Sequence, residues 1–97
     1  MFSSRSFTND TVLTRVAAAA DAIGRMPKKE LLAIPTPDFV GEYNRTRKAF
    51  VELNPALSDA APPEVLDQCA YVELLAYYEQ LRGLLSEVFL RSKTAGR

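Results

Sequence analysis

The stretch AYVELLAYYEQLRGLLSEVFL, residues 70–90, predicts a long amphipathic helix and decides the fold class. It contains no proline, and its apolar side chains recur at intervals of three and four residues, the spacing of a seam that faces another helix. Continued back to the two prolines at positions 62 and 63, the pattern predicts one helix over residues 63–91. The seam consists of Leu66, Ala70, Leu74, Tyr77, Leu81, Leu84 and Val88. We expect it to lie in the core.

A second apolar row widens this seam on one side. The margin is formed by Tyr71, Tyr78, Leu85 and Phe89. Tyrosine combines a large apolar ring with a polar tip, and it is enriched at the edges of cores and in protein interfaces. Ordinary half-buried packing is the simpler interpretation of Tyr71 and Tyr78, and the margin is the candidate partner-binding surface.

Two shorter amphipathic helices are predicted upstream, over residues 9–25 and 38–53. The apolar face of the first contains Val12, Leu13, Val16, Ala20 and Ile23. The apolar face of the second contains Phe39, Val40, Tyr43, Phe50, Val51 and Leu53. The second helix is closed by Asn54 and Pro55, and residues 54–63 have the composition of a loop.

A short helix around residues 28–33 is favoured by the proline before it and the two prolines after it. No alternation of period two is long enough for a strand. The sequence therefore predicts an all-α fold, a three-helix bundle with a short fourth helix and a long C-terminal helix. It is expected to form a single helical domain over residues 1–97, with flexible tails at residues 1–8 and 92–97.

The composition fits one small domain with a thin core. Of the 97 residues, 47% are apolar and 25% are charged, as in ordinary globular proteins. A chain of this length buries only about 60 to 65% of the surface that its unfolded form exposes. Twelve basic and twelve acidic residues cancel, so no whole-molecule field directs the chain to nucleic acid or anionic lipid. A charged partner must therefore meet a local patch.

The sequence contains few features that indicate where in the cell the protein is located. There is no run of about 18 apolar residues and no hydrophobic block near the start, so neither a membrane span nor a secretory signal is predicted. The single cysteine, Cys69, fits a reducing compartment. We expect a cytoplasmic protein that does not bind membranes.

Histidine is absent, which removes the residue on which most acid–base, nucleophile-activating and zinc sites depend. The four glycines form neither a P-loop nor a dinucleotide-binding fingerprint. Glu73 and Glu87 share a stripe but lack the histidine that helical di-metal sites add, so we interpret them as a solvated face. Cys69 has no basic residue within one helical turn and is interpreted as a packing residue. We expect no enzymatic activity, no cofactor and no metal.

Arg47 is the unusual charge of the second helix, because it falls inside the apolar arc between Tyr43 and Val51. The simplest interpretation is a stem that lies on the core and a guanidinium that pairs at the rim with Glu73 or Glu87. Two alternatives are that Arg47 binds an acidic ligand or partner, or that it forms, with one of these carboxylates, the site of a small histidine-free enzyme.

A nucleic-acid-binding regulator is another alternative, using Arg45, Lys48 and the basic tail of residues 91–97. A helix separates Arg45 from Arg47 by about 200°, so these cations do not form one patch. No aromatic-basic binding motif accompanies them. We interpret them as a solvated face, and nucleic acid as the weaker partner class.

The predicted helix lengths favour a role in protein interaction. The helix over residues 63–91 would be roughly 43 Å long and its two neighbours about 25 Å each, so they cannot cover it. We therefore expect a small protein-interaction module, such as an adaptor, inhibitor or regulatory subunit. It would bind a second copy or a protein partner through its C-terminal helix. The candidate partner-binding residues are Tyr71, Tyr78, Leu85, Phe89 and Arg47.

Overall fold

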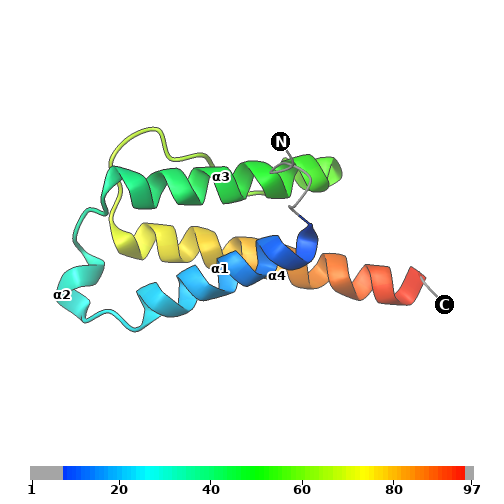
Figure 1. Cartoon of the computed structure of the whole chain (residues 1–97), viewed down its shortest axis with the longest axis horizontal. Helices are drawn as coiled ribbons and strands as arrows, with labels where there is room; N and C mark the ends of the chain where they lie inside the picture. Colours follow the sequence, from blue (N-terminus) through cyan, green and yellow to red (C-terminus); the bar gives the residue numbers. More distant parts are fainter. Residues whose placement is uncertain (1–7, 96–97) are drawn as a thin grey trace.

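Four α-helices and one turn of 3-10 helix make up the described part of the chain, residues 8–95, in the computed structural model (Figure 1). The helices are α1 (Asn9–Gly24), α2 (Lys28–Leu31), α3 (Pro37–Leu53) and α4 (Tyr71–Ala95), and η2 (Pro55–Leu57) follows α3. Side chains are described for residues 8–91. The predicted all-α bundle, with three main helices, a short fourth helix and a long C-terminal helix, is confirmed.

The starts of α1 and α3 follow from local sequence. The hydroxyl of Thr8 accepts a hydrogen bond from the N–H of Thr11, whose own hydroxyl accepts one from the N–H of Thr8. The hydroxyl of Thr36 accepts a hydrogen bond from the N–H of Phe39 at 3.3 Å, and Pro37 suits the first turn of α3. Both helices match their predicted ranges to within one residue.

α3 and α4 run in the same direction, and α1 runs opposite to both (Figure 1). Because α4 begins at the end of the bundle where α3 also begins, the chain has to travel back along α3 between them. Residues 58–70, here called the return segment, run back along α3 and consist of turns and non-helical chain.

The predicted start of the third main helix is wrong: α4 begins at Tyr71, not at residue 63. A helix that began at residue 63 would use the backbone carbonyls of residues 62–65 for its own hydrogen bonds. Instead, the carbonyls of Pro62, Pro63 and Val65 accept hydrogen bonds from side chains of α3, which hold this part of the chain out of a helix. Leu66, assigned above to the core seam, lies on the return segment and is 85% exposed.

The first turn of α4 has two local supports. The N–H of Ala70 donates a hydrogen bond to Glu73 Oε1 at 2.8 Å, half of a capping box. The N–H of Tyr71 donates to the carbonyl of Ala33 at 3.0 Å, which ties the start of α4 to the chain after α2. These contacts explain why the helix begins here once the return segment has reached this end of the bundle.

The predicted C-terminal tail is wrong over residues 92–95, which continue α4. Thr8, placed in the predicted N-terminal tail, is the cap of α1. Residues 1–7 and 96–97, the remainder of both predicted tails, lie outside the described residues.

One face of each main helix forms the core. Its apolar members are Val12, Val16, Ala20, Ile23, Tyr43, Ala49, Phe50, Leu74, Tyr78, Leu81 and Leu85. α1 has its most extensive contact with α4, whereas aromatic rings fill the space between α3 and α4. The ring centroids of Tyr43 and Tyr78 lie 5.2 Å apart, as do those of Phe39 and Tyr71, both in edge-to-face geometry. The predicted apolar face of α1 is confirmed except that Leu13 is only half-buried.

Candidate functional site

The predicted partner-binding margin of α4 lies largely inside the molecule. Tyr78 is 1% exposed and Leu85 is 0% exposed, so the prediction that they face a partner is wrong. Tyr71 is half-buried against Phe39, and Phe89 is half-buried. None of the four is a freely exposed side chain.

The buried face of α4 is turned by about 50°, half of the 100° step between successive residues, from the predicted seam. Its fully buried row is Leu74, Tyr78, Leu81 and Leu85, whereas Tyr77, Leu84 and Val88 are half-buried. The reason is that α4 packs against both α1 and α3, so its most buried line lies between the seam and the margin. A helix wheel cannot place this line, because the positions of two neighbouring helices determine it.

The opposite face of α4 carries apolar and small residues in contact with solvent. We call it the outer stripe, and it consists of Val72, Ala76, Gly83 and Leu90. Val72 is 40% exposed and Leu90 is 63% exposed. A Cβ added to Gly83 would meet nothing within 4 Å. The last three of these residues are spaced by one heptad, which keeps them on one side of the helix.

α4 is also longer than its neighbours. It has 25 residues, about 38 Å, against 16 residues in α1 and 17 in α3, about 24 and 26 Å. Its C-terminal turns extend past the start of α1 and the end of α3 (Figure 1). The predicted mismatch of helix lengths is therefore present, although the surplus lies at one end of α4 only.

Arg47 contacts the return segment and, among residues 8–91, pairs with no carboxylate. Its Nε donates a hydrogen bond to the carbonyl of Pro62 at 2.7 Å. Glu73 accepts from the N–H of Ala70, and Glu87 lies 4.0 Å from Arg91. The predicted pairing of Arg47 with Glu73 or Glu87 is therefore wrong, and the structure does not bring together the residues of the enzyme alternative.

Two neighbours of Arg47 also bind the return segment. The Asn44 side chain donates to the carbonyl of Val65 and accepts from its N–H, both at 2.9 Å, and the Tyr43 hydroxyl donates to the carbonyl of Pro63 at 2.8 Å. Sequence analysis missed Asn44 because its backbone partner lies 21 residues away and is recognisable only after folding.

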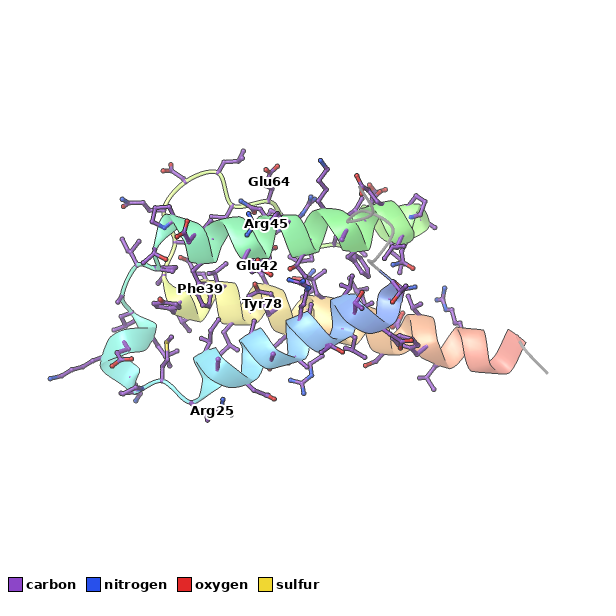
Figure 2. All side chains as sticks on the ribbon, viewed as in Figure 1. Arg25, Phe39, Glu42, Arg45, Glu64 and Tyr78 are labelled. Carbon is purple, nitrogen blue, oxygen red and sulfur yellow. The ribbon has the colours of Figure 1, made fainter. Side chains whose placement is uncertain are left out.

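An open cavity of about 420 Å³ lies where α3 meets the return segment. It is lined by Asn44, Arg45, Arg47, Lys48 and Glu64. In Figure 2, Glu64 projects from the return segment on the outer side of α3. Three basic and one acidic side chain thus surround the cavity, and Arg45 and Arg47 contribute to the same cavity although they lie far apart on the helix wheel.

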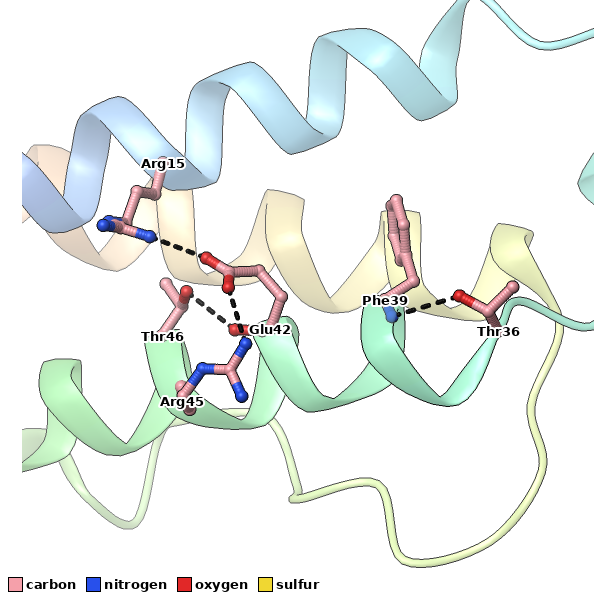
Figure 3. Close-up of polar contacts among 6 residues, drawn as sticks. All are labelled: Arg15, Thr36, Phe39, Glu42, Arg45 and Thr46. Atoms are coloured by element: carbon pink, nitrogen blue, oxygen red, sulfur yellow. Dashed lines mark hydrogen bonds and ion pairs between the residues drawn. The ribbon is translucent and has the colours of Figure 1, made fainter.

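Glu42 of α3 pairs with Arg15 of α1 and with Arg45, which also lines the cavity (Figure 3). Its Oε2 lies 2.7 Å from Arg15 Nη1 and its Oε1 lies 2.9 Å from Arg45 Nη2. The hydrogen bond from Arg45 is the largest influence that lowers the pKa of Glu42; Arg15 acts in the same direction, and partial burial opposes both. Because all three side chains are well exposed, we assign this network a stabilisation of about 1 kcal/mol or less.

Cys69 lacks the environment of a reactive thiol. Partial burial, with a smaller contribution from the Glu73 carboxylate, raises its pKa, which lowers the fraction of nucleophilic thiolate. Among residues 8–91, no three Cys, Asp or Glu side chains are placed to hold a metal ion. In the same part of the chain, no helix has the length and apolar content needed to cross a bilayer.

The fold and its surfaces define a small all-α bundle with a polar cavity on α3 and an exposed apolar stripe on α4. Comparison of the chain with protein-family models, with curated proteins and with solved structures found no match in any of the three. Its function is therefore argued from its own residues.

Proposed function

We propose that the chain is a small protein-interaction module that pairs with a helix of a second copy through the outer stripe of α4. The single observation that carries this proposal is Gly83. A glycine inside an exposed helix destabilises it by about 1 kcal/mol relative to alanine. Among the described residues, no contact requires a glycine at this position, because a Cβ there would meet nothing within 4 Å. A glycine does allow the backbone of another helix to approach closely.

The neighbours of Gly83 on the outer stripe support the same proposal. Ala76 and Leu90 lie one heptad before and after it, the spacing of a seam between two helices. Val72 is 40% exposed and Leu90 is 63% exposed, so pairing would remove apolar surface from water. The C-terminal turns of α4 project beyond the start of α1 and the end of α3, so neither of these helices lies beside them (Figure 1).

Self-association also suits the size of the domain. A chain of about 100 residues has a thin core, and oligomerisation is a common way for small domains to gain buried apolar area. The one cysteine, Cys69, is a free thiol, which is usual in reducing compartments, and we propose that the module acts in the cytoplasm.

The proposal is tested by sedimentation equilibrium over a concentration series, with the wild-type chain and Gly83→Gln. We expect the wild type to form a dimer and Gly83→Gln to remain monomeric, because the longer side chain holds the two helices apart. At concentrations where the wild type is monomeric, Gly83→Gln should raise the free energy of unfolding by about 0.5 to 1 kcal/mol, since glutamine favours helix more than glycine does.

These opposite effects separate pairing from folding. The matched control is Ala18→Gln, which places the same side chain at an exposed position of α1 and should leave the dimer intact. A wild-type chain that stays monomeric at every concentration contradicts the proposal. So does a Gly83→Gln variant that dimerises as strongly as the wild type.

A further inference from the structure

Arg47 is held in position by a group that does not neutralise its charge. Its Nε donates to the Pro62 carbonyl at 2.7 Å, and Pro62 is fully buried. Among residues 8–91, no carboxylate lies within ion-pair distance of Arg47, and no hydrogen bond occupies its two Nη nitrogens. The guanidinium is thus fixed at one edge and keeps the pair of donors that binds an oxyanion in bidentate fashion.

The cavity next to Arg47 has an excess of positive charge. Lys48 is exposed and, within the described residues, has no carboxylate partner. Arg45 has a partner, Glu42, but Glu42 is shared with Arg15. Glu64 is the one acidic side chain in the lining. An anion in the cavity would therefore meet two uncompensated cations on adjacent positions of α3.

Hydrogen bonds between α3 and the return segment fix the walls of the cavity in the absence of a ligand. Two hydrogen bonds between Asn44 and Val65 and one from Tyr43 to Pro63 hold the return segment against α3 at the level of Arg47. Donors that keep their geometry without a ligand lose less conformational entropy when a ligand binds. The volume, about 420 Å³, falls within the range of small-molecule sites.

We infer that this cavity binds the phosphoryl group of a small soluble phosphate monoester. The Nη nitrogens of Arg47 donate to two phosphoryl oxygens, and the Lys48 ammonium contacts the third. Two cations match the double negative charge of a phosphate monoester better than the single charge of a carboxylate. Glu64, which also lines the cavity, repels a second anionic group on the ligand. Its carboxylate accepts a hydrogen bond from a hydroxyl or amino group of the ligand. The inference is independent of pairing through α4.

The test is an amide NMR titration of the full chain with inorganic phosphate near pH 7.5, at constant ionic strength maintained with sodium chloride. We expect saturable shift changes confined to residues 44–48 and 62–66. Shifts that rise without saturation, or that spread over the whole surface, overturn the inference.

Two substitutions in the cavity and a matched control on α2 sharpen the test. Lys48→Gln should weaken phosphate binding about tenfold, because it removes a charge-assisted hydrogen bond. Glu64→Gln should strengthen binding severalfold, because it removes the repulsive charge. Lys29→Gln, the same lysine substitution on α2, should leave binding unchanged. Arg47→Gln is expected to abolish binding, but it also removes the contact with Pro62, so Lys48 and Glu64 carry the test. Equal affinities in Lys48→Gln and Lys29→Gln overturn the inference.

Two further probes separate the sources of a phosphoryl group. A short single-stranded DNA oligonucleotide and vesicles containing phosphatidic acid are titrated under the same conditions. Competition of inorganic phosphate with either probe for the same amides supports the cavity as a phosphoryl site. An oligonucleotide that binds with steep salt dependence while free phosphate leaves residues 44–48 unshifted overturns the inference in favour of a nucleic-acid surface.

Discussion

Tyr43 and Tyr78 are core residues with ionisable hydroxyl groups. Both side chains are at most 1% exposed, and the hydroxyl of Tyr43 donates to the Pro63 carbonyl. Burial raises the pKa of Tyr78 to about 12, with a smaller contribution from the charge of Glu42. Burial also raises the pKa of Tyr43, and the positive charge of Arg47 opposes this effect. The folded chain therefore holds these two protons more tightly than the unfolded chain does.

The raised pKa values predict a loss of stability in alkali. A raised pKa in the folded state contributes stability that is complete below the unfolded value of 10.0 and is lost as pH rises through the folded value of about 12. For Tyr78 alone, we expect the free energy of unfolding to fall by about 1 kcal/mol between pH 8 and pH 11. Urea unfolding at the two pH values measures the difference.

The Tyr78→Phe variant tests the origin of this loss. Phenylalanine keeps the ring and removes the ionisable hydroxyl, so the fall in stability between pH 8 and pH 11 should be smaller than in the wild type by about the same 1 kcal/mol. Adding Tyr43→Phe should reduce the fall further. If both variants lose as much stability as the wild type, the tyrosines are not its cause.

At the scale of elements, the return segment depends on side chains of α3 for its conformation. Its described contacts with α3 include those of Asn44 with Val65, of Tyr43 with Pro63 and of Arg47 with Pro62. Each contact satisfies a backbone group that a helix would otherwise have used. Because side chains of α3 occupy these backbone groups, residues 63–70 do not form the helix that their sequence predicts.

Removing the Asn44 side chain should loosen the return segment without unfolding α3. We expect Asn44→Ala to lower the free energy of unfolding by about 1 to 2 kcal/mol, because Val65 loses partners for both its N–H and its carbonyl. Amide hydrogen exchange at Val65 should accelerate more than exchange in α3. Gln68→Ala, an exposed substitution in the same segment, is the control. Unchanged protection of the Val65 amide in Asn44→Ala would show that Asn44 does not hold the segment.

For the molecule as a whole, the orientation of α4 decides which leucines stabilise the fold. Leu85, predicted to lie in the margin, is fully buried, whereas Leu66, predicted to lie in the core seam, is 85% exposed. Leu85→Ala should lower the free energy of unfolding by about 2 to 5 kcal/mol, and Leu66→Ala by less than about 0.5 kcal/mol. Chemical denaturation of the two variants measures both values. Similar losses in both would mean that α4 begins earlier or faces another way.

Much of the architecture was predictable from local patterns. The apolar period identified the three main helices, and the ranges predicted for α1 and α3 agree with the structure to within a residue. Of the candidate site residues, Arg47 was recognised from the sequence as unusual, but its hydrogen-bond partner, the Pro62 carbonyl, was not predicted. Asn44 and Glu64 gave no signal, because their roles depend on two segments about twenty residues apart meeting in space.

The all-α class, the number of main helices and the buried face of α1 follow from local sequence, because helix periodicity and capping act between residues a few positions apart. Three features depend on contacts between distant segments: the start of α4, the full burial of Tyr78 in place of Tyr77, and the basic cavity on α3. The physical reason is shared by all three. Side chains of α3 capture the backbone at residues 62–65, which directs the chain back along α3 and sets the place where α4 starts and the side it presents to both neighbours.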